Sequence, residues 1–416
     1  MKILYVLDSY YPKIDGPAIA INQIAKSLTE NKLASVDLLV PSYPNYKDEF
    51  SYKVIRCKSM FGTDGYRTPL PAQDHNLKKL LKNEKYDLIH IHSPFTLCNY
   101  VMKYAKKNNI PTICTIHTKY KSDFKRKLKL NFLVNFMMKY IKNNLNKADH
   151  LLTVSKQFTQ EIKTIYKCKK KANVIRNATD FADCNIASDK IHELQKLYNL
   201  TNEFKFLYVG RIVENKNIQF SLKALSELKK ITDKKFKFFI VGEGDYKNNL
   251  IKLSKELDLE NEVIFTGLIN NRDELKCYYK MCDLFLFPST FDTCGIVVLE
   301  AGSLSLPSLV AKNTCASELI EHNFNGFSAE LEVNSWCKTL NEIINISSSK
   351  YDEIKTNAKK TLSSTWKDCS LIHLNYYKFV LLLHKMKTTN KLIFKKYYNL
   401  KPSKINNKNL YKGVIF

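Results

Sequence analysis

Two basic residues at a fixed spacing stand out in the second half of the sequence. Arg211 and Lys216 lie five positions apart, directly after Gly210 and before an apolar stretch at 218–230 that has helical periodicity. Fixed cations beside a glycine turn and a helix start can bind a phosphate group through charge and hydrogen bonds. The spacing therefore predicts a phosphate clamp at the end of the strand expected at 204–209.

Two acidic residues, Asp292 and Glu300, stand eight positions apart further along the chain. Asp292 lies in a polar turn after the apolar strand 285–287, and Glu300 lies in a helix predicted to start at Gly295. The N–H groups of that helix start attract phosphate, and the Glu300 carboxylate could accept hydrogen bonds from two vicinal hydroxyls, as on a ribose. The alternative is an ordinary strand-turn-helix in which Asp292 caps the helix and Glu300 is solvated. These residues alone leave both interpretations open.

The run 287–300 (FPSTFDTCGIVVLE), with 317–320 and 325–327 after it, resembles the donor-binding signature of family 4 of the retaining glycosyltransferases. The resemblance covers about residues 1–385 and implies a GT-B fold, in which two Rossmann-like doubly wound α/β domains face each other across a cleft. It also implies transfer of a sugar from a nucleotide diphosphate to an acceptor hydroxyl with retention of the anomeric configuration. The family usually carries Glu where this chain has Asp292, a departure that bears on the placement of the donor sugar.

The resemblance assigns roles to individual residues. It implies that Arg211 and Lys216 bind the donor diphosphate and that Glu300 binds the ribose. Asp292 and His117 are expected at the transferred sugar, so the catalytic residues would be Arg211, Lys216, His117 and Asp292. The further donor contacts that it implies come from Gly16, Gly210, Leu268, Ile269, Cys294, Gly295 and Ile296.

Gly16 and His117 follow predicted strands of the first half of the chain. Gly16 comes after the strand 2–7 and a loop, and it suits either a simple turn or a close approach of backbone to a donor phosphate. His117 ends the strand 112–116, at the edge where open parallel sheets bind ligands. A lone histidine there would be structural, and the resemblance is what favours a contact with the sugar.

No metal and no cofactor are expected, and the nucleotide sugar is a co-substrate. His90 and His92 alternate on a strand, but without a third nearby ligand this spacing favours a buried strand end over a metal site. No Asp-x-Asp follows a strand to hold a divalent ion against a diphosphate, so we expect metal-independent catalysis. The glycines of the run 242–244 lack the spacing of a dinucleotide fingerprint, which argues against a nicotinamide enzyme.

The order of the predicted elements favours two α/β domains. Strands and helices alternate along the chain, as a parallel, doubly wound sheet requires. We expect an acceptor-side N-terminal domain at 1–180 and a donor-binding domain at 203–365, joined by a hinge at 181–202. The helix 366–386 is expected to return to the first domain, and a basic tail follows at 387–416.

The net charge of +26 is concentrated in two segments, 119–147 and 385–416, which together supply 17 of these charges. Both segments interleave Lys with aromatic and aliphatic residues, a pattern that fits an anionic membrane surface at least as well as a nucleic acid. In the first segment Phe132, Phe136 and Tyr140 recur at helical spacing and could insert into lipid. A coding preference for Lys and Asn along the whole chain is the competing explanation.

Three classes of function follow from these features. The expected one is a glycosyltransferase with a lipid-linked or cell-surface glycan acceptor, cytoplasmic and peripheral on the inner face of the cell membrane. The scattered cysteines fit a reduced compartment, and no apolar run reaches the roughly 20 residues that span a bilayer. Asp292 in place of Glu motivates the alternative of a catalytically weak sugar-nucleotide-binding protein. A basic nucleic-acid-binding protein is disfavoured, because no recognisable nucleic-acid-reading module is present.

Overall fold

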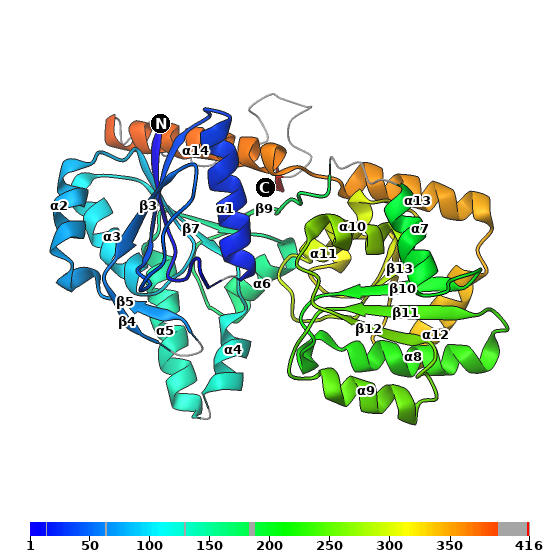
Figure 1. The fold of residues 1–416 in the computed structure, drawn as a ribbon. Helices are drawn as coiled ribbons and strands as arrows, with labels where there is room; N and C mark the ends of the chain where they lie inside the picture. Colours follow the sequence, from blue (N-terminus) through cyan, green and yellow to red (C-terminus); the bar gives the residue numbers. More distant parts are fainter. Residues whose placement is uncertain (14, 63–64, 129, 183–187, 390–413, 416) are drawn as a thin grey trace. The chain divides into compact units, whose positions relative to one another are not determined.

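The computed structural model describes residues 1–13, 15–62, 65–128, 130–182, 188–389 and 414–415. The chain divides into two compact units (Figure 1). The first consists of Met1–Asn177 and Trp366–Phe416, and the second consists of Ala178–Thr365. Apart from 387–389 and 414–415, the basic tail predicted at 387–416 lies outside the described residues.

The first unit contains one eight-stranded sheet. Its strands are β1 (Lys2–Val6), β2 (Ser35–Pro41), β3 (Lys53–Cys57), β6 (Leu88–Ile91), β7 (Thr112–Ile116), β8 (His150–Thr153), β9 (Ala172–Ile175) and β16 (Val414–Ile415). They are arranged in the order β16-β9-β8-β7-β6-β1-β2-β3, and each neighbouring pair is parallel except β16 and β9. β6 and β7 are buried at every residue, as expected for inner strands of a parallel sheet that is covered on both faces. A separate antiparallel pair is formed by β4 (Ser59–Phe61) and β5 (Arg67–Pro69).

The helices of the first unit are α1 (Gly16–Glu30), α2 (His75–Asn83), α3 (Thr96–Asn108), α4 (Tyr120–Lys127), α5 (Asn131–Lys147), α6 (Lys156–Thr164) and α14 (Trp366–Thr389), with a 3-10 turn, η1, at Pro71–Gln73. α1 begins where the Asp15 carboxylate accepts a hydrogen bond from the Ala18 N–H at 2.9 Å. α14 packs against α1, and its Tyr377 hydroxyl is hydrogen-bonded to the Tyr5 hydroxyl and to His90 Nδ1, each at 2.7 Å. The last helix is therefore part of the core of the first unit.

The second unit contains a six-stranded sheet. Its strands are β10 (Phe204–Val209), β11 (Phe236–Val241), β12 (Val263–Gly267), β13 (Leu284–Phe287), β14 (Ser308–Ala311) and β15 (Phe327–Ala329). The order is β12-β11-β10-β13-β14-β15, with every pair parallel. Successive side chains alternate between the faces: Phe206 and Tyr208 join the hydrophobic cluster on one face, and Leu207 and Val209 join the cluster on the other.

Helices cover both faces of this second sheet (Figure 1). α8 (Ile218–Ile231), α9 (Lys247–Glu256) and α12 (Val333–Ile344) pack on one face, and α7 (Ser188–Leu197), α10 (Arg272–Met281) and α11 (Ile296–Ser303) pack on the other. α13 (Ser348–Leu362) contributes to both clusters. Two 3-10 turns complete the unit, η2 (Glu214–Lys216) and η3 (Ser317–Leu319).

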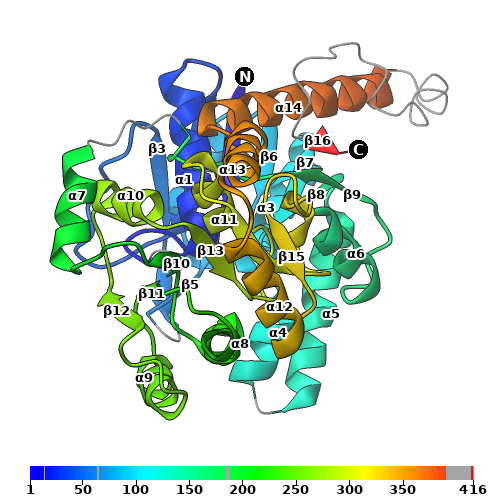
Figure 2. The ribbon, with the colours of Figure 1, turned by 90° about the vertical axis from the view of Figure 1, so that its right-hand side faces the viewer.

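Two of the segments expected from the sequence have a different structure. The amphipathic segment predicted at 119–146 forms two helices, α4 and α5, which lie side by side (Figures 1 and 2). α12 and α13 are separated at 345–347, where Asn and Ser favour a helix end and a new cap. The range 181–202, predicted as a hinge, contains α7, and Leu194 of this helix packs on the core of the second unit.

No helix among the described residues is both long and apolar enough to cross a membrane.

Candidate active site

The strand order of the second sheet reverses at β10. This strand pairs with β11 on one side and with β13 on the other, so the chain leaves the carboxyl ends of β10 and β13 in opposite directions. Open α/β sheets bind their ligands at such a switch point. The segments 210–216 and 288–295 follow these two strands, which places the predicted phosphate clamp and the predicted acidic turn at the same edge of the sheet.

Two glycines hold the loop after β10 against the loop after β11. A Cβ on Gly242 would lie 1.9 Å from the Gly210 carbonyl oxygen, and a Cβ on Gly244 would lie 2.1 Å from the Ile212 carbonyl oxygen. The N–H groups of Gly210 and Ile212 donate to carbonyl oxygens of the neighbouring stretch at 3.0 and 2.9 Å. The backbone that carries Arg211 is therefore fixed by close packing that a side chain at either glycine would prevent.

Lys216 and Asp292 form an ion pair across the switch point. Lys216 Nζ donates to the two Asp292 carboxylate oxygens at 2.6 and 2.8 Å, and 13% and 25% of the two side chains are exposed. The next residue, Asn217, donates from Nδ2 to the Pro288 carbonyl oxygen at 3.2 Å. These contacts join the two loops. The alternative in which Asp292 caps α11 is wrong, because α11 begins without a side-chain cap.

Arg211 is exposed at the same edge. Within the part of the chain that the structure describes, its guanidinium makes no hydrogen bond or ion pair. It lies within electrostatic reach of Tyr208: burial raises the pKa of the Tyr208 hydroxyl far above its usual value, Asp292 adds to the rise and Arg211 opposes it. Arg211 and Asp292 therefore lie near the same phenol, with the arginine available to an anion.

The start of α11 lies beside this pair. Gly295 precedes the helix with a φ of +69°, a left-handed conformation that favours glycine, and a Cβ there would come within 3.1 Å of the Ala316 Cβ. Cys294 is buried and Ile296 is half-buried. The first turn of α11 contains no acidic residue. Because the first N–H groups of a helix lack partners within the helix, this end can accept a phosphate.

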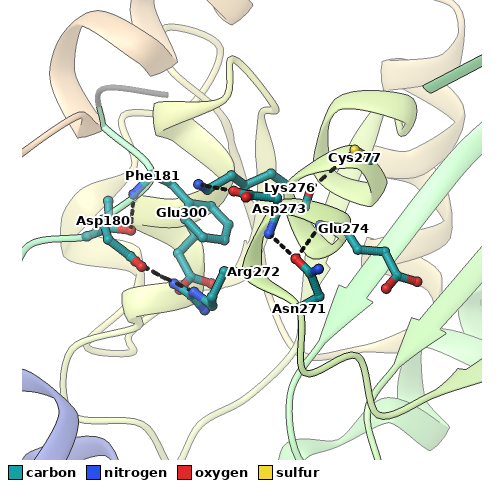
Figure 3. A network of polar contacts seen from close by, with 10 residues as sticks. Asp180, Phe181, Asn271, Arg272, Asp273, Glu274, Lys276, Cys277 and Glu300 are labelled. Atoms are coloured by element: carbon teal, nitrogen blue, oxygen red, sulfur yellow. Dashed lines mark hydrogen bonds and ion pairs between the residues drawn. The ribbon is translucent and has the colours of Figure 1, made fainter. Parts of the chain in front are cut away.

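Glu300 lies one turn further along α11 and is buried, with 5% of its surface exposed. Its Oε1 accepts a hydrogen bond from Arg272 at 2.9 Å (Figure 3), and its Oε2 accepts one from the Tyr279 hydroxyl at 2.8 Å. Burial raises the pKa of Glu300, whereas Arg272 and Tyr279 oppose the rise. The alternative of a solvated Glu300 is therefore wrong. The sequence did not reveal these partners, because they lie 28 and 21 positions away.

Leu268 and Ile269 lie in the loop after β12. Gly267 turns the chain there with a φ of +81°. Leu268 is 63% exposed, whereas Ile269 is half-buried against the core of the second unit. An exposed Leu beside a backbone turn can cover one face of a nucleotide base, and this contact stays a prediction.

His117 and Gly16 lie in the first unit. His117 follows β7, is buried, and places its Nε2 atom 3.1 Å from His92 Nδ1. Burial lowers the pKa of His117 to about 3, and His373 contributes to the shift. The imidazole is thus neutral near pH 7, so it can exchange hydrogen bonds without carrying charge. Gly16 opens α1, and no atom lies within 4 Å of the position that a Cβ would take. Its donor contact stays a prediction.

His90 has a structural position within the first unit. Its Nδ1 is hydrogen-bonded to the Tyr377 hydroxyl and its Nε2 to the Thr115 hydroxyl, each at 2.7 Å. Both ring nitrogens are thus engaged by the fold itself. Among the described residues, no group of three or more His, Cys, Asp or Glu side chains is arranged to hold a metal ion.

Comparison with known proteins relates both units to one group of enzymes. The family model described as "Glycosyl transferases group 1" matches residues 189–361, and the model described as "Glycosyltransferase Family 4" matches residues 14–183. The alpha-monoglucosyldiacylglycerol synthase of Streptococcus pneumoniae is 28% identical over 334 residues, which cover 78% of this chain and 74% of the relative. The UDP-Gal:alpha-D-GlcNAc-diphosphoundecaprenol alpha-1,3-galactosyltransferase of Escherichia coli is 27% identical over 321 residues, 75% of this chain and 77% of the relative.

The fold is shared with solved structures of glycosyltransferases. The crystal structure of Anabaena Alr3699/HepE in complex with UDP is similar with a TM-score of 0.73 at 20% sequence identity, covering 91% of this chain and 100% of that chain. The two family models follow one another along the sequence and account for most of both units. The chain therefore belongs to glycosyltransferase family 4, and it is a glycosyltransferase of the GT-B fold with two Rossmann-like sheets.

Proposed function

We propose that this protein transfers a sugar from a nucleoside diphosphate to the hydroxyl of a lipid-linked or glycolipid acceptor, with retention of the anomeric configuration. The observation that carries the donor half of the proposal is the sheet edge where Arg211, the Lys216–Asp292 pair and the start of α11 follow β10 and β13. The solved structures of Alr3699/HepE contain UDP and UDP-glucose, which supports a nucleotide sugar as the donor.

The cationic groups stabilise the charge that develops on the leaving diphosphate. Arg211 is exposed, so a diphosphate can meet it without breaking an ion pair of the described residues. Lys216 is held by Asp292 and shares its charge between the carboxylate and the phosphate. The first N–H groups of α11 add a third source of positive potential. Because these groups supply the positive charge, the proposed reaction uses no metal ion and no other cofactor.

The carboxylates orient the sugar ends of the donor. Among the described residues each Glu300 oxygen accepts one hydrogen bond, so each keeps a further acceptor position for one of two vicinal ribose hydroxyls. Asp292 keeps further acceptor positions beside Lys216, which suits a hydroxyl of the transferred sugar. The neutral imidazole of His117 is proposed as a hydrogen-bonding partner of the same sugar.

The proposed acceptor rests on the relatives and on the surface of α4 and α5. The two relatives described above are named for a glucosyldiacylglycerol and for a diphosphoundecaprenol, both of them lipids. On α5, Phe132 and Phe136 are 66% and 65% exposed and share a face with Lys139. Tyr140, which was also predicted to insert into lipid, instead donates its hydroxyl to the Phe95 carbonyl oxygen at 3.3 Å. α4 contacts α5 and carries three exposed basic side chains in its last turn: Lys125, Arg126 and Lys127.

We therefore propose that α4 and α5 dock on an anionic membrane surface, which places the protein on the inner face of the cell membrane. Each basic residue near such a surface contributes about 1 kcal/mol, and exposed Phe side chains add apolar burial. The second basic segment, 385–416, lies largely outside the described residues, so this proposal rests on the first segment.

Incubation with a panel of nucleotide sugars and lipid acceptors tests the proposed function. We expect release of nucleoside diphosphate that depends on an acceptor lipid, and a product whose anomeric proton coupling, measured by nuclear magnetic resonance, matches that of the donor. An inverted anomeric centre would contradict retention. Donor binding without turnover on any acceptor or in water would instead favour a catalytically weak sugar-nucleotide-binding protein.

A further inference from the structure

Arg272 lies between two carboxylates of the second unit, as Figure 3 shows. Its Nη2 atom donates to Glu300 Oε1 at 2.9 Å and to Asp180 Oδ1 at 2.5 Å, and its Nε atom donates to Asp180 Oδ2 at 3.2 Å. The guanidinium carbon lies 4.3 Å from the centre of the buried Phe181 ring. Two carboxylates and an aromatic face therefore fix the orientation of this planar cation.

One face of α10 supplies both groups that contact the Glu300 carboxylate. Arg272 is the first residue of this helix, and Tyr279 follows seven positions later, which is about two turns and the same face. Asn271 caps the helix by accepting hydrogen bonds from two N–H groups of the first turn at 2.9 and 3.2 Å (Figure 3). The cap and the buried Tyr279 thus fix where Arg272 leaves the helix.

The charges in this network support an ionised Glu300. A buried carboxylate is costly to ionise unless a cation lies nearby. Burial raises the pKa of Glu300, and Arg272 is the strongest opposing influence. Burial alone would lower the pKa of Arg272, but Glu300 and Asp180 outweigh it and raise the pKa. Asp180 thus fixes the guanidinium of Arg272 through two hydrogen bonds, whereas Glu300 accepts only one hydrogen bond from it.

We propose that Arg272 is a positioning residue that aims the Glu300 carboxylate at the two vicinal hydroxyls of the nucleotide ribose, and that Asp180 holds Arg272 in place. This inference rests on the proposed function, because it assigns the ribose of the donor to Glu300. Arg272 and Tyr279 each occupy one acceptor position of the carboxylate. Without Arg272 the carboxylate can rotate or take up a proton, and either change removes an acceptor that faces the donor.

Calorimetric titration with UDP and with 2′-deoxy-UDP tests this inference. The parent protein should prefer UDP, and Glu300→Gln should lose that preference. Arg272→Gln should lower the preference about 10-fold, as expected for loss of a hydrogen bond to a charged group, and Arg272→Lys should restore part of it. Arg272→Gln leaves a buried carboxylate without its cation and should lower the melting temperature, but nearly half of the Arg272 side chain is exposed, so the variant should remain folded under the titration conditions.

The outcomes separate the inference from the proposed function. A parent protein that binds neither nucleotide, or a Glu300→Gln variant that keeps the full preference for UDP, would contradict the assignment of the ribose to Glu300. Loss of the preference in Glu300→Gln together with its full retention in Arg272→Gln would overturn only the positioning role of Arg272.

The pH dependence distinguishes positioning from a role in folding. In Arg272→Gln the preference for UDP should fall as the pH is lowered, and the fall should begin at a higher pH than in the parent, because Glu300 without Arg272 takes up a proton more readily. Arg56→Gln is the matched control, since it removes an arginine–carboxylate pair with Asp48 in the first unit. It should change neither the preference for UDP nor the pH dependence of that preference. Asp180→Asn should give a smaller loss of the same kind. A lowered melting temperature with an unchanged pH profile in Arg272→Gln would overturn the inference.

Discussion

The Nζ atom of Lys216 lies 2.6 and 2.8 Å from the two carboxylate oxygens of Asp292. The pair joins the turn after β10 to the turn after β13, across 76 positions of sequence. A diphosphate that approaches Lys216 therefore meets a cation whose position is already set and whose charge is shared. Asp292 holds the lysine, and in the proposed function its remaining acceptor positions bind a hydroxyl of the transferred sugar.

Removal of either cation should slow the reaction. Arg211→Ala and Lys216→Ala should each lower kcat by about two to four powers of ten, the effect of losing one preorganised charge partner of a developing anion. Neither side chain is part of the hydrophobic core, so the melting temperature should change little. Steady-state kinetics with the best donor and acceptor measure the effect.

Lys223→Ala is the matched control for these two variants. Lys223 is an exposed lysine on α8, in the same unit, and its loss should leave kcat unchanged. Near-parental rates in both Arg211→Ala and Lys216→Ala would show that the phosphate binds elsewhere.

Substitutions of Asp292 test its pairing with Lys216. Asp292→Glu restores the residue that the family usually carries, and we expect activity equal to or above that of the parent. Asp292→Asn leaves Lys216 without its carboxylate partner, so the product nucleoside diphosphate should bind more tightly and inhibit more strongly. Inhibition constants for that product measure this effect. A folded but inactive Asp292→Glu variant would instead show that the shorter carboxylate is adapted to the donor of this enzyme.

The strands around the site were predictable from local sequence. β10 begins and ends where its apolar run predicted, at 204 and 209, because side chains such as Phe206 and Leu207 are buried on opposite faces of the sheet. α9 was not predicted, since Leu250 and Ser254 are its only buried residues among those described and the periodic signal is correspondingly weak.

The contacts within the site could not be read from spacing. Position 300 was placed correctly within a helix, but its burial depends on Arg272 and Tyr279 of a separate helix. Asp180 and Arg272 meet across 92 positions, and no local pattern links them. The sequence thus locates the residues that could do chemistry, whereas the partners that set their charge and direction come from tertiary packing.

The first unit should lose stability in mild acid. His90, His92, His117 and His373 are buried there, and burial lowers the pKa of each, to about 3 for His117 and about 4 for His373. The unfolded chain takes up protons below about pH 6.5, so each histidine reduces the unfolding free energy by up to about 1.4 kcal/mol per pH unit from there toward about pH 4. Asp8 opposes this trend, because burial raises its pKa to about 7.

The two tryptophans allow this prediction to be measured unit by unit. Trp366 opens α14 in the first unit, and Trp336 is buried in the second. Denaturant unfolding followed by fluorescence in Trp336→Phe should therefore show a midpoint that falls between about pH 7.5 and about pH 5.5. In Trp366→Phe the midpoint should move less, since His192 and His322 of the second unit are exposed. Equal shifts of the unfolding midpoint in both variants would contradict the assignment of the acid sensitivity to His90, His92, His117 and His373.

Docking by α4 and α5 should depend on lipid charge. We expect the protein to sediment with anionic vesicles and to remain in solution with zwitterionic ones, and added salt should weaken the binding by screening the surface. Phe132→Ser combined with Phe136→Ser should reduce the bound fraction, because both side chains are exposed and available to lipid.

Ile231→Ser serves as the control for vesicle binding. Ile231 is 58% exposed at the end of α8 in the second unit, and its loss should not change sedimentation. Equal binding to neutral and anionic vesicles, or none to either, would favour a soluble acceptor.

The chain enters the second unit at Ala178 and returns to the first at Trp366, so the second unit is one continuous insertion within a discontinuous first unit. During synthesis on the ribosome, β1 and β6 therefore emerge long before α14. Until α14 arrives, Tyr5 and His90 lack the Tyr377 hydroxyl that both contact, and a buried polar group without its partner is costly. The second unit has all its strands and helices in one run of chain and can complete its fold as soon as that run is made. We therefore expect the first unit, whose strands are made before the second unit, to complete its fold after it.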